Sequence, residues 1–203
     1  MDTKKRITLL ALCLASSPAW SSNFGLNFSA GIPLLTTDLG SGYTPGLGAK
    51  TFTEIEVTRN LGDLPLTWGV YFQGFFISDF GQLPYSSSGI SISYFPFGLS
   101  LDSVNQSLKS GAQTQKRRIA AFFNAKLGLA SLNLREKTGA QTNIGASGLS
   151  YSVAAGVEFP ISNSLAIGPQ MQFLTTILLK DYSDNAISLS GYNFGAQFRY
   201  LLD

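Results

Sequence analysis

The sequence contains no histidine and a single cysteine in 203 residues, and only 13% of its residues are charged. Without histidine, the chain has no Ser-His-Asp or Cys-His catalysis, no histidine-ligated metal site and no imidazole pH switch. The charged fraction is about half of the roughly 25% that is usual for a soluble domain. Intrinsic disorder is excluded as well, because 44% of the residues are apolar and 12% are aromatic.

A long apolar run is also missing. No stretch approaches 18 uninterrupted apolar residues, so the sequence predicts no membrane-spanning helix. The one marked apolar segment, residues 7–15, has basic residues before it and small residues after it, an order that is typical of a secretory signal peptide. We therefore expect residues 1–21 to be a cleaved signal peptide, with cleavage after Ala19 or Ser21, and residues 22–203 to form one domain.

Cleavage of this segment would change both the thiol content and the net charge. Cys13 lies within it, so the mature chain would have no thiol. Lys+Arg would fall from 14 to 11 with the loss of Lys4, Lys5 and Arg6, and Asp+Glu from 12 to 11 with the loss of Asp2. The mature net charge would be zero, so we expect no nucleic-acid partner.

What the sequence does have, after residue 22, is a period of two. In 66–76, for example, Leu66, Trp68 and Val70 alternate with polar or small residues. Eight segments show this alternation and are each long enough to cross a membrane at a tilt: 24–32, 51–58, 66–76, 89–101, 119–128, 149–159, 165–173 and 192–202. Within 89–101 the parity changes at Pro96, where we expect a bulge to shift the register.

Two architectures fit strands with one apolar face. In a soluble sandwich or a lipocalin-like barrel the apolar face is the core, and the other face needs many charged residues. Here the other face carries mostly Gly, Ser, Asn, Gln, Ala and Thr, which suit the narrow interior of an eight-stranded barrel. The sequence therefore predicts an all-β fold, a closed antiparallel up-and-down transmembrane β-barrel of about eight strands. Val153 and Phe194 would face lipid, whereas Glu158 and Gln197 would face the lumen.

Three segments carry a family resemblance: AAGVEFPISNSLAIG at 154–168, FNAKLGL at 123–129 and GYNFGAQFRY at 191–200. They resemble the small OmpA-like/OmpX-like superfamily of bacterial outer-membrane β-barrels. The last segment is similar to the C-terminal signal that the barrel-assembly machinery reads in that family. The resemblance implies a Gram-negative outer membrane with both termini in the periplasm. It implies extracellular loops at 36–50, 78–89, 136–147 and 180–186, and periplasmic connections at 59–65, 102–118 and 160–164.

Five charged residues fall on the predicted inward face: Glu54, Glu56, Lys126, Glu158 and Arg199. Charges in a narrow lumen must pair, because an isolated buried charge is very costly to desolvate. Two interpretations follow. The predicted lumen ionic cluster is either a structural plug that fixes the register or a gate that lets small solutes or water pass.

Catalysis receives little support. Glu54 and Glu56 lie on one side of a strand, and paired carboxylates can serve in acid/base chemistry. No histidine or activated nucleophile accompanies them, and barrel enzymes that resemble this chain in size depend on a histidine-containing site. We therefore predict no catalytic residue, no cofactor and no metal.

The sequence predicts a monomeric, non-enzymatic barrel, surrounded by outer-membrane lipid, with a structural or surface-interaction role. A passive, porin-like channel for small solutes is the alternative, and a soluble periplasmic lipocalin-like carrier is the third hypothesis.

Overall fold

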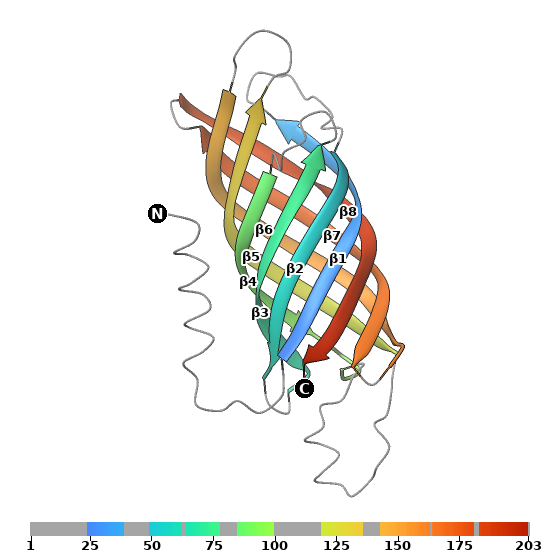
Figure 1. The fold of residues 1–203 in the computed structure, drawn as a ribbon. Coiled ribbons are helices and arrows are strands. Elements are labelled where there is room, and N and C mark those ends of the chain that lie inside the picture. Colours follow the sequence, from blue (N-terminus) through green and yellow to red (C-terminus); the bar gives the residue numbers. More distant parts are fainter. Residues whose placement is uncertain are drawn as a thin grey trace, which may run out of the picture.

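The computed structural model describes residues 24–38, 49–61, 64–77, 85–99, 119–135, 143–162, 164–180 and 183–202. In chain order the strands are β1 (Phe24–Asp38), β2 (Ala49–Asn60), β3 (Leu66–Ile77), β4 (Tyr85–Tyr94), β5 (Ala120–Arg135), β6 (Asn143–Pro160), β7 (Leu165–Lys180) and β8 (Ser183–Leu202). Each strand pairs antiparallel with the next and β8 closes onto β1, which makes a closed barrel (Figure 1). The predicted fold class is confirmed.

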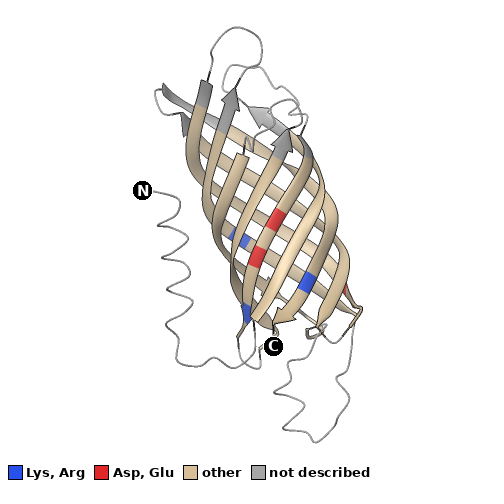
Figure 2. Cartoon of the chain, viewed as in Figure 1, with Lys and Arg blue, Asp and Glu red and all other residues tan. Residues whose placement is uncertain are grey.

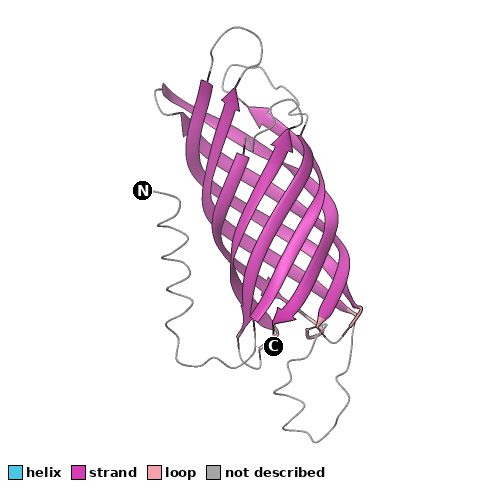
Figure 3. Ribbon diagram, in the orientation of Figure 1, coloured by secondary structure: helices cyan, strands magenta, loops and turns pink. Residues whose placement is uncertain are grey.

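The part of the chain that the structure describes contains strands and short turns (Figure 3). That part of the chain includes no helix long and apolar enough to cross a membrane. The two ends of the barrel differ in which strand ends they carry. We call the end where β1 starts and β8 ends, at the bottom of Figure 1, the proximal end, and the opposite end the distal end.

The register of the sheet fixes the tilt of the strands. One circuit of paired residues, each inward-facing, runs from Gly25 through Thr58, Gly69, Ser91, Lys126, Ser152, Leu174 and Gly191 back to β1 at Leu35. The circuit therefore climbs ten residues of β1 (35 − 25) while it passes eight strands. Such a shear requires the strands to lean by about 40° from the barrel axis, as in other small closed barrels.

The distal ends of several strands lie inside segments that the sequence predicts as loops. β4 begins at Tyr85, within the predicted loop 78–89, and β6 begins at Asn143, within 136–147. β7 and β8 extend through almost all of the predicted loop 180–186. The loops were predicted from turn residues and polar composition. The strands extend into these segments because their residues form hydrogen bonds with a neighbouring strand.

The expected bulge at Pro96 is wrong. β4 ends at Tyr94, and the chain turns at residues 96–97, with the amide of Gly98 donating to the carbonyl of Phe95. Gly98 has a φ of 86°, a left-handed conformation that favours glycine. The parity change in the sequence therefore marks the end of a strand and not a shift within it.

Large apolar side chains cover the outside of the wall. Val153, Phe194 and Phe198 are 55%, 48% and 39% exposed, whereas Gln197 and Glu158 are 7% and 1% exposed. A soluble barrel needs the reverse arrangement, because in water the observed one would expose a largely apolar surface. The wall therefore has the distribution of a barrel that is solvated by lipid.

Candidate functional site

All five residues of the predicted lumen ionic cluster lie inside the barrel and are at most 5% exposed. Period-two geometry explains this placement, because each belongs to the inward-facing set of its strand. Figure 2 shows the charged positions along the proximal and middle parts of the wall. The structure does not bring all five together, however, and divides them into two groups.

The first group joins β2 and β5. The ammonium of Lys126 lies 2.6 Å from Oε1 of Glu54, and both side chains are almost fully buried. These strands are not neighbours in the sheet, so the ion pair spans the lumen. Lys126 Nζ also lies 5.7 Å from the centroid of the Tyr71 ring, a cation–π contact that adds to its stabilisation.

Glu56 completes the first group, held by neutral donors. The amide of Asn27 donates to Glu56 Oε2 at 3.0 Å, and the amide of Asn124 donates to Oε1 at 3.4 Å. The hydroxyl of Ser91 donates to the same Oε1. Three strands thus supply hydrogen bonds to one carboxylate, which is the arrangement that stabilises a buried negative charge.

The second group lies at the proximal end. Arg199 Nη1 lies 3.6 Å from Oε2 of Glu158, and the amide of Gln197 donates to Glu158 Oε1 at 3.1 Å. The guanidinium of Arg199 also lies 4.8 Å from the centroid of the Phe95 ring. Phe95 directly follows β4, so the turn after that strand contributes to the proximal end of the lumen.

A neutral polar network adjoins the first group, because Glu54 pairs with Gln73 of that network. The amide of Gln172 donates to Gln73 and Ser152, at 3.2 and 3.0 Å, and accepts a hydrogen bond from Asn193 at 3.0 Å. Gln172 therefore connects β3, β6 and β8 through the centre of the barrel.

Tyr71 extends this network with its hydroxyl 3.1 Å from Ser87 Oγ, which in turn lies 2.5 Å from Ser150 Oγ. Glycine makes room for it: a Cβ at Gly128 would lie 2.4 Å from the Tyr71 hydroxyl. The large inward side chain of Tyr71 on β3 thus occupies the space that the missing side chain of Gly128 leaves on β5.

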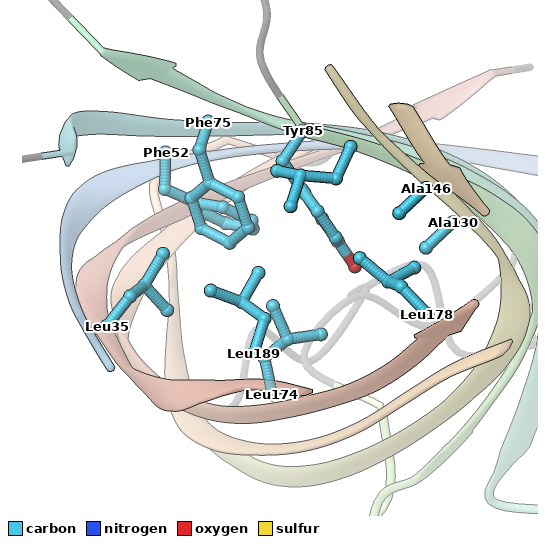
Figure 4. Close-up of a cluster of buried hydrophobic side chains, with 10 residues drawn as sticks. Leu35, Phe52, Phe75, Tyr85, Ala130, Ala146, Leu174, Leu178 and Leu189 are labelled. Carbon is cyan, nitrogen blue, oxygen red and sulfur yellow. The ribbon is translucent and has the colours of Figure 1, made fainter. Parts of the chain in front are cut away.

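An apolar layer occupies the distal lumen, where the sequence predicts polar and small residues. Ten buried residues form it: Leu35, Phe52, Phe75, Tyr85, Ala130, Leu132, Ala146, Leu174, Leu178 and Leu189. Figure 4 shows their side chains converging from opposite sides of the barrel. The Phe75 ring lies 5.5 Å from the Phe52 ring and 4.9 Å from the Tyr85 ring, between centroids. We call these ten residues the distal apolar layer.

Sequence reasoning missed the distal apolar layer. Its inward parity could have revealed it, since Leu174 follows inward-facing Gln172 by two residues. A smaller group at the proximal end, the proximal apolar cluster, consists of Phe95, Ala120 and Phe122 with Leu99 packed against them. The first charged group and the neutral network therefore lie between the two apolar groups, whereas the second charged group lies beside the proximal apolar cluster.

This arrangement favours packing over chemistry. The buried carboxylates are engaged by Lys126, Arg199 and amide or hydroxyl donors. Within the described residues, no group of three or more His, Cys, Asp and Glu side chains is placed to hold a metal ion.

No family model matches the chain, and no curated protein matches it. Among solved structures, it is similar to Neisserial surface protein A (NspA), with a TM-score of 0.55, 14% identity, and coverage of 88% of this chain and 97% of that one. Lower scores are found for the N-terminal β-barrel domain of Pseudomonas aeruginosa OprF, with a TM-score of 0.48, 7% identity and coverage of 88% and 98%. The outer membrane protease OmpT from Escherichia coli gives a TM-score of 0.46 and 12% identity, with coverage of 92% and 100%.

The chain thus has the fold of the small outer-membrane β-barrels. The fold that the sequence resemblance implies, a small closed antiparallel barrel, is confirmed. A fold alone does not specify an activity, so any function must follow from the side chains of the lumen and the wall.

Proposed function

We propose that this protein is an integral, non-enzymatic β-barrel of the bacterial outer membrane, and that its role is structural or lies in contacts made by its surface. The inverted wall supports this most directly: large apolar side chains are exposed and all five predicted ionic residues are buried. Lipid is the solvent in which this distribution is favourable, and closure leaves no unpaired strand edge. Outer-membrane lipid is then the main partner, and the barrel is a monomer.

The route to that membrane is part of the proposal. Residues 1–21, the predicted signal peptide, lie outside the described residues. Residues 191–200 belong to β8, the strand that closes the barrel, and we assign this segment as the one that the barrel-assembly machinery engages. The proximal end would then face the periplasm and the distal end the cell exterior.

A packed lumen favours the structural role over a channel. The interior of an eight-stranded barrel is just wide enough for side chains to fill, and here they fill it. Phe52, Phe75 and Leu178 are at most 1% exposed, and they lie where a solute would enter from the distal end. An apolar constriction excludes water and ions by dewetting.

A passive channel for small solutes is the second candidate, on one observation. Several buried polar atoms of the described lumen have no hydrogen-bond partner, among them Asn27 Oδ1, Asn124 Oδ1 and Glu54 Oε2. They would suit a hydrated passage if the distal apolar layer opened. Planar-bilayer recording separates the two roles: we expect silence from the packed barrel, and steady openings would favour the channel.

The membrane assignment has its own test. Cells expressing the full chain are fractionated, and the membranes are washed with alkaline carbonate. We expect the protein to stay in the outer-membrane fraction and to migrate differently on a gel before and after boiling. Release by osmotic shock without detergent would instead support the soluble lipocalin-like carrier and overturn the proposal.

A further inference from the structure

The apolar wall has different heights on two sides of the barrel. On β1, outward positions are apolar from Phe24 to Leu34, and on β6 from Phe159 to Leu149. Ten residues of strand at a tilt of about 40° cover about 25 Å along the axis, which matches the apolar band of membrane barrels. On β4, outward positions are apolar only from Tyr94 to Ile90, or about 10 Å by the same conversion.

Hydroxyl groups and glycine replace the missing apolar positions. Five residues on neighbouring strands form what we call the hydroxyl face: Thr51 and Thr53 on β2, Gly74 on β3, and Ser86 and Ser88 on β4. Thr53 pairs with Gly74, and Gly74 pairs with Ser86, so the face is continuous across three strands. All five occupy outward positions by strand parity, because the residues that alternate with them, Phe52, Gln73 and Ser87 among them, are buried and face inward. Gly74 has no side chain and is itself buried, whereas the four hydroxyl residues are exposed or partly exposed.

The hydroxyl face lies at the depth of apolar side chains on the adjoining strand. Thr53 pairs with Ala30 of β1. Distal to Ala30, β1 continues outward with Ile32 and Leu34, which are 64% and 62% exposed. Distal to Thr53, β2 continues outward with Thr51. Polar and apolar surfaces therefore stand side by side at one level of the wall.

A groove extends from the hydroxyl face toward β6. Its volume is about 450 Å³, and its outward-facing lining combines apolar and hydroxyl side chains: Phe72, Ser86, Ser88, Leu129, Ser131 and Ser147. In one register row Ser88 lies between Phe72 and Leu129, and in the next, more distal row Ser86 pairs with Ser131. The groove thus has an apolar part below and a hydroxyl part above, as a lipid has.

We propose that the distal leaflet is thinned beside β2–β4, and that the neutral headgroup region of a membrane lipid lies against the hydroxyl face with its chain along Phe72 and Leu129. Hydroxyls buried in hydrocarbon would lack partners, whereas ester carbonyls, sugar hydroxyls and interfacial water supply them. A barrel wall that is too short is accommodated by local thinning of the bilayer. The hydroxyl face and the lining of the groove contain no charged residue, so neutral groups are the expected contacts.

This inference rests on the proposed membrane location, and spin labels at matched depths test the two separately. In a Cys13→Ser background, Ser88→Cys on the hydroxyl face is compared with Ile32→Cys on β1 and Tyr151→Cys on β6. Each labelled barrel is reconstituted in vesicles of palmitoyl-oleoyl phosphatidylcholine. Its collision rate is measured with oxygen, which enters hydrocarbon, and with a water-soluble nickel chelate.

We expect the label at position 88 to be several-fold more accessible to the nickel chelate than the two control labels, which should favour oxygen. If all three favour oxygen, thinning is overturned while the membrane location stands. If the control labels favour the nickel chelate, the membrane location itself fails. A label at position 88 that neither reagent reaches would mean that a second copy covers the face, which also overturns the lipid assignment.

A second variant asks whether the hydroxyls cause the thinning. Ser86→Leu and Ser88→Leu together extend the apolar wall on β4, and a label at Thr53→Cys reports the result. We expect its nickel accessibility to fall several-fold while the heat-dependent gel shift stays unchanged, because the substitutions face outward. An unchanged accessibility in the folded variant would contradict a role for the hydroxyl face.

Discussion

The distal and proximal halves of the lumen are filled with different chemistry. The distal half is closed by the distal apolar layer, in which aromatic and leucine side chains meet across the barrel (Figure 4). The proximal and middle parts hold the five buried charges, in two separate groups (Figure 2). Apolar packing needs a filled volume and tolerates exchange of one apolar group for another, whereas each buried charge needs a particular partner.

Because of this difference, we expect the two halves to contribute differently to the stability and the register of the barrel. Removing a contact from the distal apolar layer loses burial and leaves a cavity. Removing one partner from a charged group leaves a charge that the lumen cannot solvate. The ion pair between Lys126 and Glu54 also connects strands that are not adjacent, so we expect the charged half to specify the register and the apolar half to add stability.

Lys126→Met gives the largest expected effect. It leaves Glu54 and Glu56 buried without a cation, and breaking a buried pair in this way costs about 3–5 kcal/mol. The loss in the free energy of unfolding is measured by urea titration in detergent micelles, with the heat-dependent gel shift as the readout of the folded fraction.

A double-mutant cycle with Glu54→Gln provides the control. The double variant lacks both partners of the ion pair, so neither is left buried without the other. We therefore expect it to be clearly more stable than the sum of the two single losses predicts. Additive losses would show that the ion pair contributes no specific coupling.

Phe75→Ala probes the distal half in the same assay. Its ring is 1% exposed and contacts two other rings, so truncation should cost about 3–4 kcal/mol. Phe72→Ala is the matched control on the same strand, because Phe72 faces outward and is 51% exposed. Equal losses at the two positions would contradict a packed distal apolar layer.

Arg199→Ala comes next, with an expected loss of about 2–3 kcal/mol, because it leaves the buried carboxylate of Glu158 without a cation. Glu158 keeps the hydrogen bond from Gln197, which limits the loss relative to Lys126→Met. Conductance is measured on the same variant. Higher conductance with little loss of stability would support the gate and contradict the structural plug.

The sequence is sufficient to predict which face of each strand looks inward. The period of two placed Glu54, Lys126 and Arg199 in the lumen, because the side-chain direction of a strand residue follows directly from its parity. The closed barrel followed from the low charge of the inward face and from the number of alternating segments. These features are local, and a local pattern is what a single sequence carries.

The position of each residue along the barrel axis does not follow from a local pattern, and the sequence did not predict it. Lys126 and Arg199 are on different levels because of the register and the shear, which depend on all eight strands together. The distal apolar layer was missed for a related reason. Leu132, Leu178 and Leu189 lie beyond the predicted strand ends, in extensions that exist because neighbouring strands pair there.

Tyr85→Phe, the smallest expected effect, tests the boundary between the two halves. The Tyr85 ring belongs to the distal apolar layer, while its hydroxyl lies 3.1 Å from Thr176 Oγ1 in the polar network. The substitution keeps the ring and removes one buried hydrogen bond, so we expect a loss of about 1 kcal/mol. Tyr94→Phe is the control, because Tyr94 is outward and 45% exposed, and its loss should be close to zero. A Tyr85→Phe variant as stable as the parent would mean that the ring alone holds this position and that the polar network ends one layer closer to the charges.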